Sequence, residues 1–248
     1  MAAPPFQDLG VAGSGPLTRI VVGNELSCQV QHTGDTSLEF FPSGAAPGDC
    51  GTFIASGGTL YAPAFSTHDG TATGSLGAYT PFAAVSQTAV SGSGAADSPR
   101  TVVTVADAGT LRITQTDSYV AGEESYRTDI AIKNNATATA SVTLYRAGDC
   151  YLQNTDAGFG FTDPANNGVG CAANANNTPP GRIEEFVPIS PGNKFTEDGF
   201  STVWSQIGAK APFPDTCTHC GDSIDNGAGI SWDVAVPPGA TVVRSQYT

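Results

Sequence analysis

The sequence is poor in basic residues and in charge of either sign. It holds 10 lysines and arginines against 23 aspartates and glutamates, a formal net charge of −13, and charged residues make up 13% of its 248 positions. Soluble proteins average about 25% charged residues, so this surface must depend largely on hydroxyl and amide groups. An acidic surface repels a polyanion, and we therefore expect no nucleic-acid partner.

Long apolar runs are also missing. No stretch of about 18 apolar residues is present, so we expect no membrane insertion. Residues 1–6 lack the basic and apolar regions of a signal peptide and are typical of a start codon placed before an excised segment. We therefore expect the chain to be a piece of a larger secreted or surface-displayed protein.

Recognisable catalytic motifs are lacking as well. There is no Gly-x-Ser-x-Gly, and among the histidines only His68 has a carboxylate beside it in the sequence. Paired glutamates occur at 123–124 and 184–185, but adjacent side chains on a strand point to opposite faces and cannot flank one glycosidic bond. We assign no catalytic residue and favour a non-catalytic protein.

What the chain does have is turn formers and strand formers. Its 30 glycines and 17 prolines, with 40% hydrophobic residues, favour many short strands joined by turns over a helical bundle. The clearest alternation lies in 125–134, where Tyr126, Thr128, Ile130 and Ile132 share one face. Strands are predicted over 18–22, 26–30, 101–106, 110–120, 125–134, 140–146, 182–189, 200–207, 229–236 and 240–247.

The connections between these strands predict their arrangement. The four strands of 101–146 have short connections typical of an antiparallel meander, and the strands of 229–247 are predicted to form a hairpin. Residues 151–181 are expected to be a loop, and 198–207 has a weaker helical signal as the alternative to a strand. We predict an all-β fold, an antiparallel β-sandwich or the larger supersandwich, with long disulfide-stapled loops.

One domain is expected over residues 1–248. Within it, 1–17 is expected to be an extended N-terminal segment and 90–99, rich in serine and glycine, an interior flexible loop.

The six cysteines fall into three close pairs. Proximity favours the disulfides Cys28–Cys50, Cys150–Cys171 and Cys217–Cys220, although six cysteines allow 15 pairings. Each of the first two would close a loop of about 20 residues and contribute about 3 kcal/mol. The Cys-x-x-Cys at 217–220 precedes no helix and has no second ligand pair, which disfavours a redox or zinc site. The pattern indicates a secreted or cell-surface protein.

Residues 149–160, 116–119, 125–129 and 229–248 resemble a module of large secreted and surface proteins of actinobacteria, where it lies beside Ig-like and repeat segments. The likeness runs from about residue 23 to the C-terminus. It implies an extracellular setting and no particular catalytic residue. At the level of fold, the chain also resembles the galactose-mutarotase-like supersandwich domains, which implies a fold and not an activity.

Acidic and amide residues gather in two turn-rich regions. Such oxygens suit Ca²⁺, although their spacing matches neither an EF-hand nor a glycine-rich repeat, and turns use the same residues. We expect no other cofactor. The candidate ligands of a structural Ca²⁺ ion are Asp149, Asp156, Asp163, Asp222, Asp225 and Asn226.

A glycan or another surface protein is the expected partner. Aromatic side chains rimmed by amides and carboxylates form stacking platforms for sugars, and the 151–181 segment offers this combination. The candidate ligand-binding residues are Asn154, Asp156, Phe159, Phe161, Asn166 and Asn167.

These observations favour a non-catalytic surface or adhesion module that binds carbohydrate. One alternative is a carbohydrate-active enzyme, a lyase, hydrolase or epimerase, on a supersandwich. It would require a cleft that gathers an arginine or tyrosine with at least one of Asp117, Asp129, Glu184 and Glu185. The other alternative is a structural subunit that pairs with its neighbours through sheet edges.

Overall fold

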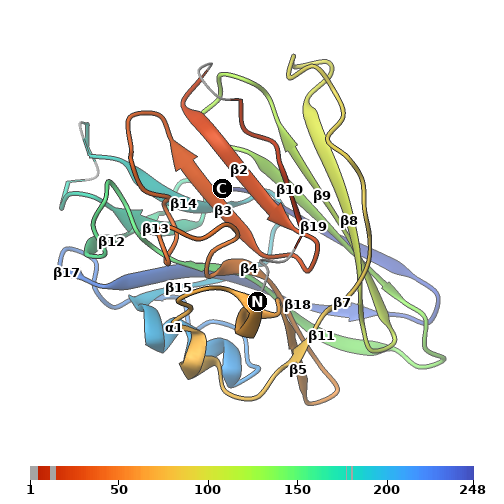
Figure 1. Cartoon of the computed structure of the whole chain (residues 1–248). Helices are drawn as coiled ribbons and strands as arrows, with labels where there is room; N and C mark the ends of the chain where they lie inside the picture. The colour runs from red at the N-terminus through yellow and green to blue at the C-terminus, as the bar shows by residue number, and fades with distance from the viewer. Residues whose placement is uncertain (1–4, 12–14, 177, 180) are drawn as a thin grey trace.

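The computed structural model describes residues 5–11, 15–176, 178–179 and 181–248, and in this part of the chain the strands form three sheets (Figure 1). The largest has nine strands, in the spatial order β17 (Ser223–Ile224), β12 (Gly158–Asp163), β13 (Gly168–Ala172), β14 (Ile183–Pro188), β19 (Thr241–Tyr247), β10 (Arg127–Asn134), β9 (Leu111–Tyr119), β8 (Arg100–Ala108) and β7 (Ala83–Gln87).

A seven-stranded sheet packs against it, and a small N-terminal sheet closes one end. The seven strands are β16 (Thr216–Cys217), β15 (Lys194–Gly199), β18 (Asn226–Val236), β11 (Ala140–Asp149), β4 (Cys50–Ser56), β5 (Thr59–Ala62) and β6 (Thr80–Pro81). The N-terminal sheet consists of β1 (Phe6–Asp8), β2 (Leu17–Gly23) and β3 (Cys28–His32). The predicted antiparallel β-sandwich is therefore confirmed.

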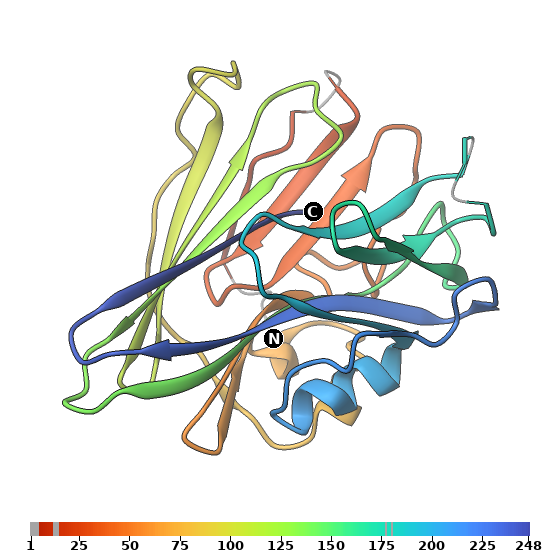
Figure 2. The same ribbon diagram turned by 180° about the vertical axis from the view of Figure 1, so that it is seen from behind.

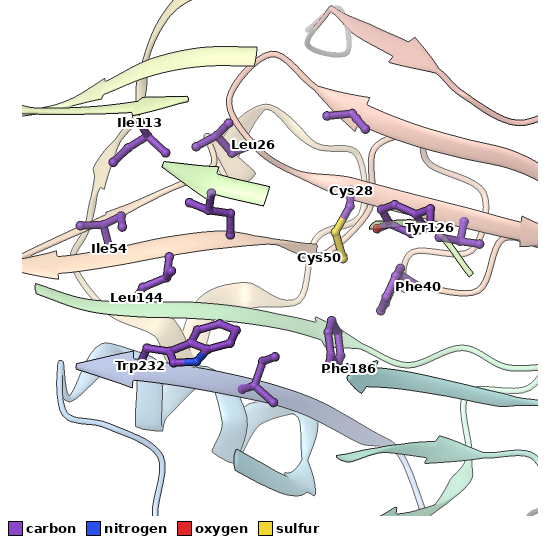
Figure 3. Close-up of a cluster of buried hydrophobic side chains, with 14 of the residues drawn as sticks. Leu26, Cys28, Phe40, Cys50, Ile54, Ile113, Tyr126, Leu144, Phe186 and Trp232 are labelled. Carbon is purple, nitrogen blue, oxygen red and sulfur yellow. A yellow bond between two sulfur atoms is a disulfide. The ribbon is translucent and has the colours of Figure 1, made fainter. Parts of the chain in front are cut away.

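The main core lies where the three sheets meet. Strand β9 alternates, with Leu111, Ile113 and Tyr119 buried on its inner face, as expected for a sheet with one solvated side. Figure 3 shows Ile113 of the large sheet, Leu26 after β2, and Ile54, Leu144 and Trp232 of the seven-stranded sheet in one apolar cluster.

A second core covers the other face of the seven-stranded sheet. Helix α1 (Phe200–Gly208) and the 3₁₀ turns η1 (Phe65–Thr67) and η2 (Thr73–Leu76) lie there, as Figure 2 shows for α1. Trp204 packs against Phe53 of β4, with ring centroids 5.7 Å apart. Because β11 is covered on both faces, Val142 to Asp149 are buried without alternation. No helix among the described residues is long and apolar enough to cross a membrane.

Three disulfides join segments close in sequence: Cys28–Cys50, Cys150–Cys171 and Cys217–Cys220. These are the pairs that proximity favours. The first ties β3 of the N-terminal sheet to β4 of the seven-stranded sheet, and the second ties the end of β11 to β13. Two of the three bonds therefore connect different sheets.

Three local predictions were wrong. Residues 200–208 are helical, because Val203, Trp204 and Ile207 place one apolar face on the seven-stranded sheet at helical spacing. The predicted terminal hairpin is absent, since β18 pairs with β11 while β19 pairs with β10 and β14 in the other sheet. The predicted meander over 101–146 does not include its last strand, because β11 belongs to the seven-stranded sheet, whereas β7, β8, β9 and β10 run consecutively in the large sheet.

The 151–181 segment also contains regular structure where a loop was expected. Strands β12 and β13 form an antiparallel hairpin, with Asp163 opposite Gly168. Turn residues dominate the sequence of this hairpin, and its short strands rely on neighbours from distant parts of the chain. Nearer the N-terminus, β1 pairs with β2, and residues 90–99 connect β7 to β8, held by backbone bridges at Ser91–Thr101 and Ala95–Ser98.

Candidate functional site

A pocket of about 700 Å³ opens between the N-terminal sheet and the β14–β19 part of the large sheet. Val30 and His32 of β3 form one wall, and Tyr247 near the C-terminus forms the opposite one. In Figure 1 the C-terminus accordingly lies beside β3. Four carboxyl side chains line the cavity, Glu39, Glu124, Glu184 and Glu185, and we call it the acid pocket.

Glu39 reaches the pocket from the segment that follows β3. Its backbone is fixed, because its N–H donates to Val30 O at 2.9 Å and its carbonyl accepts from Tyr151 N at 2.7 Å. Glu39 as a whole is only 5% exposed, and its carboxyl shares a hydrogen bond with Asp35. Burial, followed by the bond to Asp35 and the charge of Asp35, raises the pKa of Glu39 to about 8. Glu39 is therefore mostly a neutral acid at pH 7.

Glu184 is the second buried acid of the pocket. It lies on β14, where Glu184 and Phe186 are buried and Ile183 is exposed, the alternation of a strand with one covered face. Burial raises the pKa of Glu184 well above its ordinary value, and the nearby Glu39 and Asp149 add to the rise. Its Oε2 is buried and makes no hydrogen bond. Behind it, Phe186 faces Phe40, with ring centroids 6.3 Å apart (Figure 3).

The basic side chains of the pocket already have acidic partners. The Arg182 guanidinium forms an ion pair with Asp35. His32 Nε2 lies 3.2 Å from Glu124 Oε2, and its Nδ1 is 2.7 Å from Thr33 O. Glu124 is largely exposed, so this second pair belongs to the rim of the pocket.

The remaining lining of the pocket is largely apolar. Leu17, Val30 and Leu152 are buried, whereas Ile183 and Tyr247 are 45% and 40% exposed at the mouth. Tyr247 lies beside Val187, its partner in the β14–β19 register. The site therefore combines an apolar mouth with buried carboxyl groups, an arrangement typical of small-molecule pockets.

A buried polar network lies in the core near the pocket. Arg146 of β11 is fully buried and donates to the Tyr126 hydroxyl at 2.8 Å. Asp117 of β9 accepts from Thr128 Oγ1 at 2.7 Å and from Gln115 Nε2 at 2.9 Å. Burial raises the pKa of Asp117, and the Arg146 charge opposes that rise. The same positive charge opposes the rise in the pKa of Glu184. The network is therefore coupled electrostatically to the acid pocket.

The structure provides part of the cleft that the enzyme alternative would require. Glu184 and Glu185 line the acid pocket together with Arg182 and Tyr247. Of the other two carboxylates considered, Asp117 is fully buried, and Asp129 pairs with Arg127 at 2.8 Å and does not line the pocket.

The six residues predicted to bind a ligand do not line the acid pocket. Asn154 Oδ1 accepts from the backbone N–H groups of Thr36 and Ser37 and so fixes the segment before Glu39. Phe161 is buried in β12, and Phe159 of the same strand is half-buried. Asn166 donates to Asp163, and Asn167 to Asn193 Oδ1, in and beside the β12–β13 turn. Asp156, the sixth, has a pKa raised by burial.

The six candidate metal ligands are only partly brought together. Asp149, Asp156 and Asp225 lie close enough for Asp225 and Asp156 to raise the pKa of Asp149, after the larger effect of burial. Asn226 instead donates to Glu197 at 3.0 Å, Asp163 bonds to Asn166, and Asp222 is exposed near His219. Within the described ranges, no three histidine, cysteine, aspartate or glutamate side chains are placed to share a metal ion.

Sequence reasoning missed Glu39, Asp35 and Arg182. Residues 35 and 39 are four positions apart in an irregular segment, and residue 182 is more than 140 positions away. No local spacing signals such a site, because β14 reaches β3 only through the packing of two sheets. The Glu184-Glu185 pair was the available clue, since an acidic pair within a strand implies that one acid faces inward.

Comparison with known proteins gives no family assignment. No family model matches the chain, and no curated protein matches it. Among solved structures, one described as an aldose 1-epimerase from Escherichia coli K12 aligns at 11% identity and a TM-score of 0.41, covering 98% of this chain and 97% of the other. A polysaccharide lyase aligns at 10% identity and a TM-score of 0.44, covering 100% of this chain and 32% of the other.

A protein of the human microbiome described as a kojibiose phosphorylase aligns at 8% identity and a TM-score of 0.35, covering 91% of this chain and 29% of the other. All three alignments have TM-scores below 0.5, so no functional argument rests on them.

Proposed function

We propose that the chain is an extracellular saccharide-binding module whose ligand occupies the acid pocket. One observation carries the proposal: a cavity of about 700 Å³ joins an apolar mouth to buried carboxyl groups. Sugars have apolar C–H faces and hydroxyl rims, so they need an apolar wall and side chains that both donate and accept hydrogen bonds. A protonated carboxyl group does both.

The extracellular part of the proposal is supported by the cysteines. All six form disulfides, and such bonds persist in oxidising compartments. The expected partner is a glycan on a surface or in solution. Another surface protein that carries such a glycan would bind through the same pocket.

Titration calorimetry with a panel of neutral disaccharides tests the proposal. Tyr247→Ala is expected to weaken binding at least tenfold, because Tyr247 lines the mouth and is 40% exposed. Val243→Ala is the matched control, since Val243 lies on the same strand, is 47% exposed and does not line the pocket. Failure of every disaccharide to bind better than millimolar, or equal binding by the wild type and Tyr247→Ala, would overturn the proposal.

Acid–base catalysis on a saccharide is the second candidate function. It is favoured by the presence of two buried acids of raised pKa, Glu39 and Glu184, beside Arg182 in one pocket. A neutral carboxylic acid can protonate a glycosidic oxygen, and a carboxylate can accept a proton. NMR of anomer exchange and of glycosidic bond cleavage tests this candidate, with Glu39→Gln expected to abolish turnover while leaving binding intact.

A further inference from the structure

The charges around the acid pocket do not favour an anionic ligand. Arg182 is a basic side chain of the lining, and its positive charge is already engaged by Asp35. The other basic side chain of the lining, His32, is engaged by Glu124. An anion entering the pocket would have to compete with Asp35 or Glu124 for its counter-charge.

We infer that the acid pocket selects a neutral saccharide and rejects its uronic-acid counterpart. This inference rests on the proposed function and specifies the class of sugar. It stands on the placement of the charged groups, because carboxylates flank both basic side chains of the described lining.

Neutral hydroxyl groups match the unsatisfied atoms near the pocket. Arg182 Nε is a buried donor without a hydrogen-bond partner, and Glu184 Oε2 is a buried oxygen without one. A sugar hydroxyl can accept from the first and donate to the second, and the Arg182–Asp35 ion pair is preserved. Leaving buried polar atoms unpaired is costly, so a ligand that satisfies them gains affinity and specificity.

A carboxylate in the same place has the opposite effect. It would bring a further negative charge near the Asp35 carboxylate, whose side chain is buried, and like charges in a partly desolvated site repel each other. The penalty therefore falls on the acidic sugar and not on its neutral analogue.

The pH dependence of neutral-sugar binding follows from the groups around Glu39. They are Asp35 on the same segment, His32 of β3, Arg182 before β14, and Glu184 of β14, which is linked to Arg146 of β11. Above about pH 8 Glu39 loses the proton of its hydrogen bond to Asp35, and the two carboxylates then repel each other at the wall that positions Arg182. Binding of a neutral sugar should therefore weaken as the pH rises from 7 to 9.5.

The experiment compares disaccharides with the same disaccharides oxidised at C6 to uronic acids. Affinities are measured by titration calorimetry at pH 7 and pH 9.5 for the wild type and Glu39→Gln, with Glu123→Gln as the control. Glu123 is exposed and lies outside the pocket lining, next to Glu124. Circular dichroism checks that each variant is folded.

We expect the neutral sugar to bind at least tenfold more tightly than its uronic acid at pH 7. Glu39→Gln should retain this binding and lose its fall at high pH, because the amide remains a donor at both pH values. Glu123→Gln should behave like the wild type. If the uronic acid binds as tightly as the neutral sugar, or if Glu39→Gln shows the wild-type pH profile, the inference is overturned while the proposed function stands. If neither sugar binds, the proposed function fails.

Discussion

Replacing Glu39 by glutamine should make the protein more stable at high pH. The pKa of this group rises from its ordinary 4.5 to about 8 in the folded protein, chiefly because it is buried and secondly because of Asp35. The folded state therefore holds the proton more tightly than the unfolded state. The stabilisation is complete below about pH 4.5 and is lost as the pH rises through about 8.

The size of the effect follows from the same values. A rise from 4.5 to about 8, at about 1.36 kcal/mol per pH unit, corresponds to a loss of about 5 kcal/mol of folding free energy between pH 4.5 and pH 9. Glutamine has nearly the shape of the protonated acid and keeps a donor for Asp35, but it does not ionise. Glu39→Gln should match the wild type near pH 5 and exceed it by up to about 5 kcal/mol at pH 9.

Urea unfolding at one-unit steps from pH 5 to pH 9, with the disulfides intact, measures this difference. At a slope of about 3 kcal/mol per molar urea, 5 kcal/mol moves the midpoint by roughly 1.7 M. The other buried acids are present in both proteins, so their contributions largely cancel. A stability difference between Glu39→Gln and the wild type that stays constant from pH 5 to pH 9 would refute the reasoning, as would the same pH trend in the exposed control Glu123→Gln.

Three further changes test the rest of the fold by chemical denaturation. Arg146→Met should destabilise the protein by about 3–5 kcal/mol, because it leaves a buried aspartate without its counter-charge; a loss below 1 kcal/mol would contradict the role given to this network. Replacing Cys150 and Cys171 together by alanine should cost about 3 kcal/mol, the loop-closure value for a separation of 21 residues, and an unchanged midpoint would contradict it. Gly148→Ala should cost about 1–3 kcal/mol, because its methyl carbon would lie 2.1 Å from an aromatic ring, whereas Gly44→Ala, with no atom within 4 Å, should be near neutral.

The fold class and the disulfides followed from composition and spacing, because both depend on local chemistry. Alternation in 125–134 predicted β10, and the close spacing of the cysteines favoured the three bonds present in the structure. The terminal hairpin was wrong because a tight turn at 237–240 is compatible both with pairing and with crossing to another sheet. The sheet that a strand joins depends on which neighbouring strand buries more apolar surface. The local sequence gives no information about that choice.

The acid pocket was harder to predict for the same reason. Its acids lie on β14 and after β3, which come together only because two sheets pack, and Glu39 follows no motif. The Glu184-Glu185 pair was visible in the sequence. Its two side chains point to opposite faces of the strand, which argued against a catalytic pair of carboxyl groups made by these two residues alone. The structure places Glu39 from a distant segment beside Glu184.

Two of the disulfides join segments that line the acid pocket to other sheets. The strand that supplies Val30 and His32 is bonded through Cys28 to the opposite sheet, and the segment that supplies Leu152 is bonded through Cys150 to β13. A newly made chain in a reducing compartment would have these walls without their covalent connections. Ligand binding at the acid pocket, as proposed, would then depend on the formation of these two disulfides.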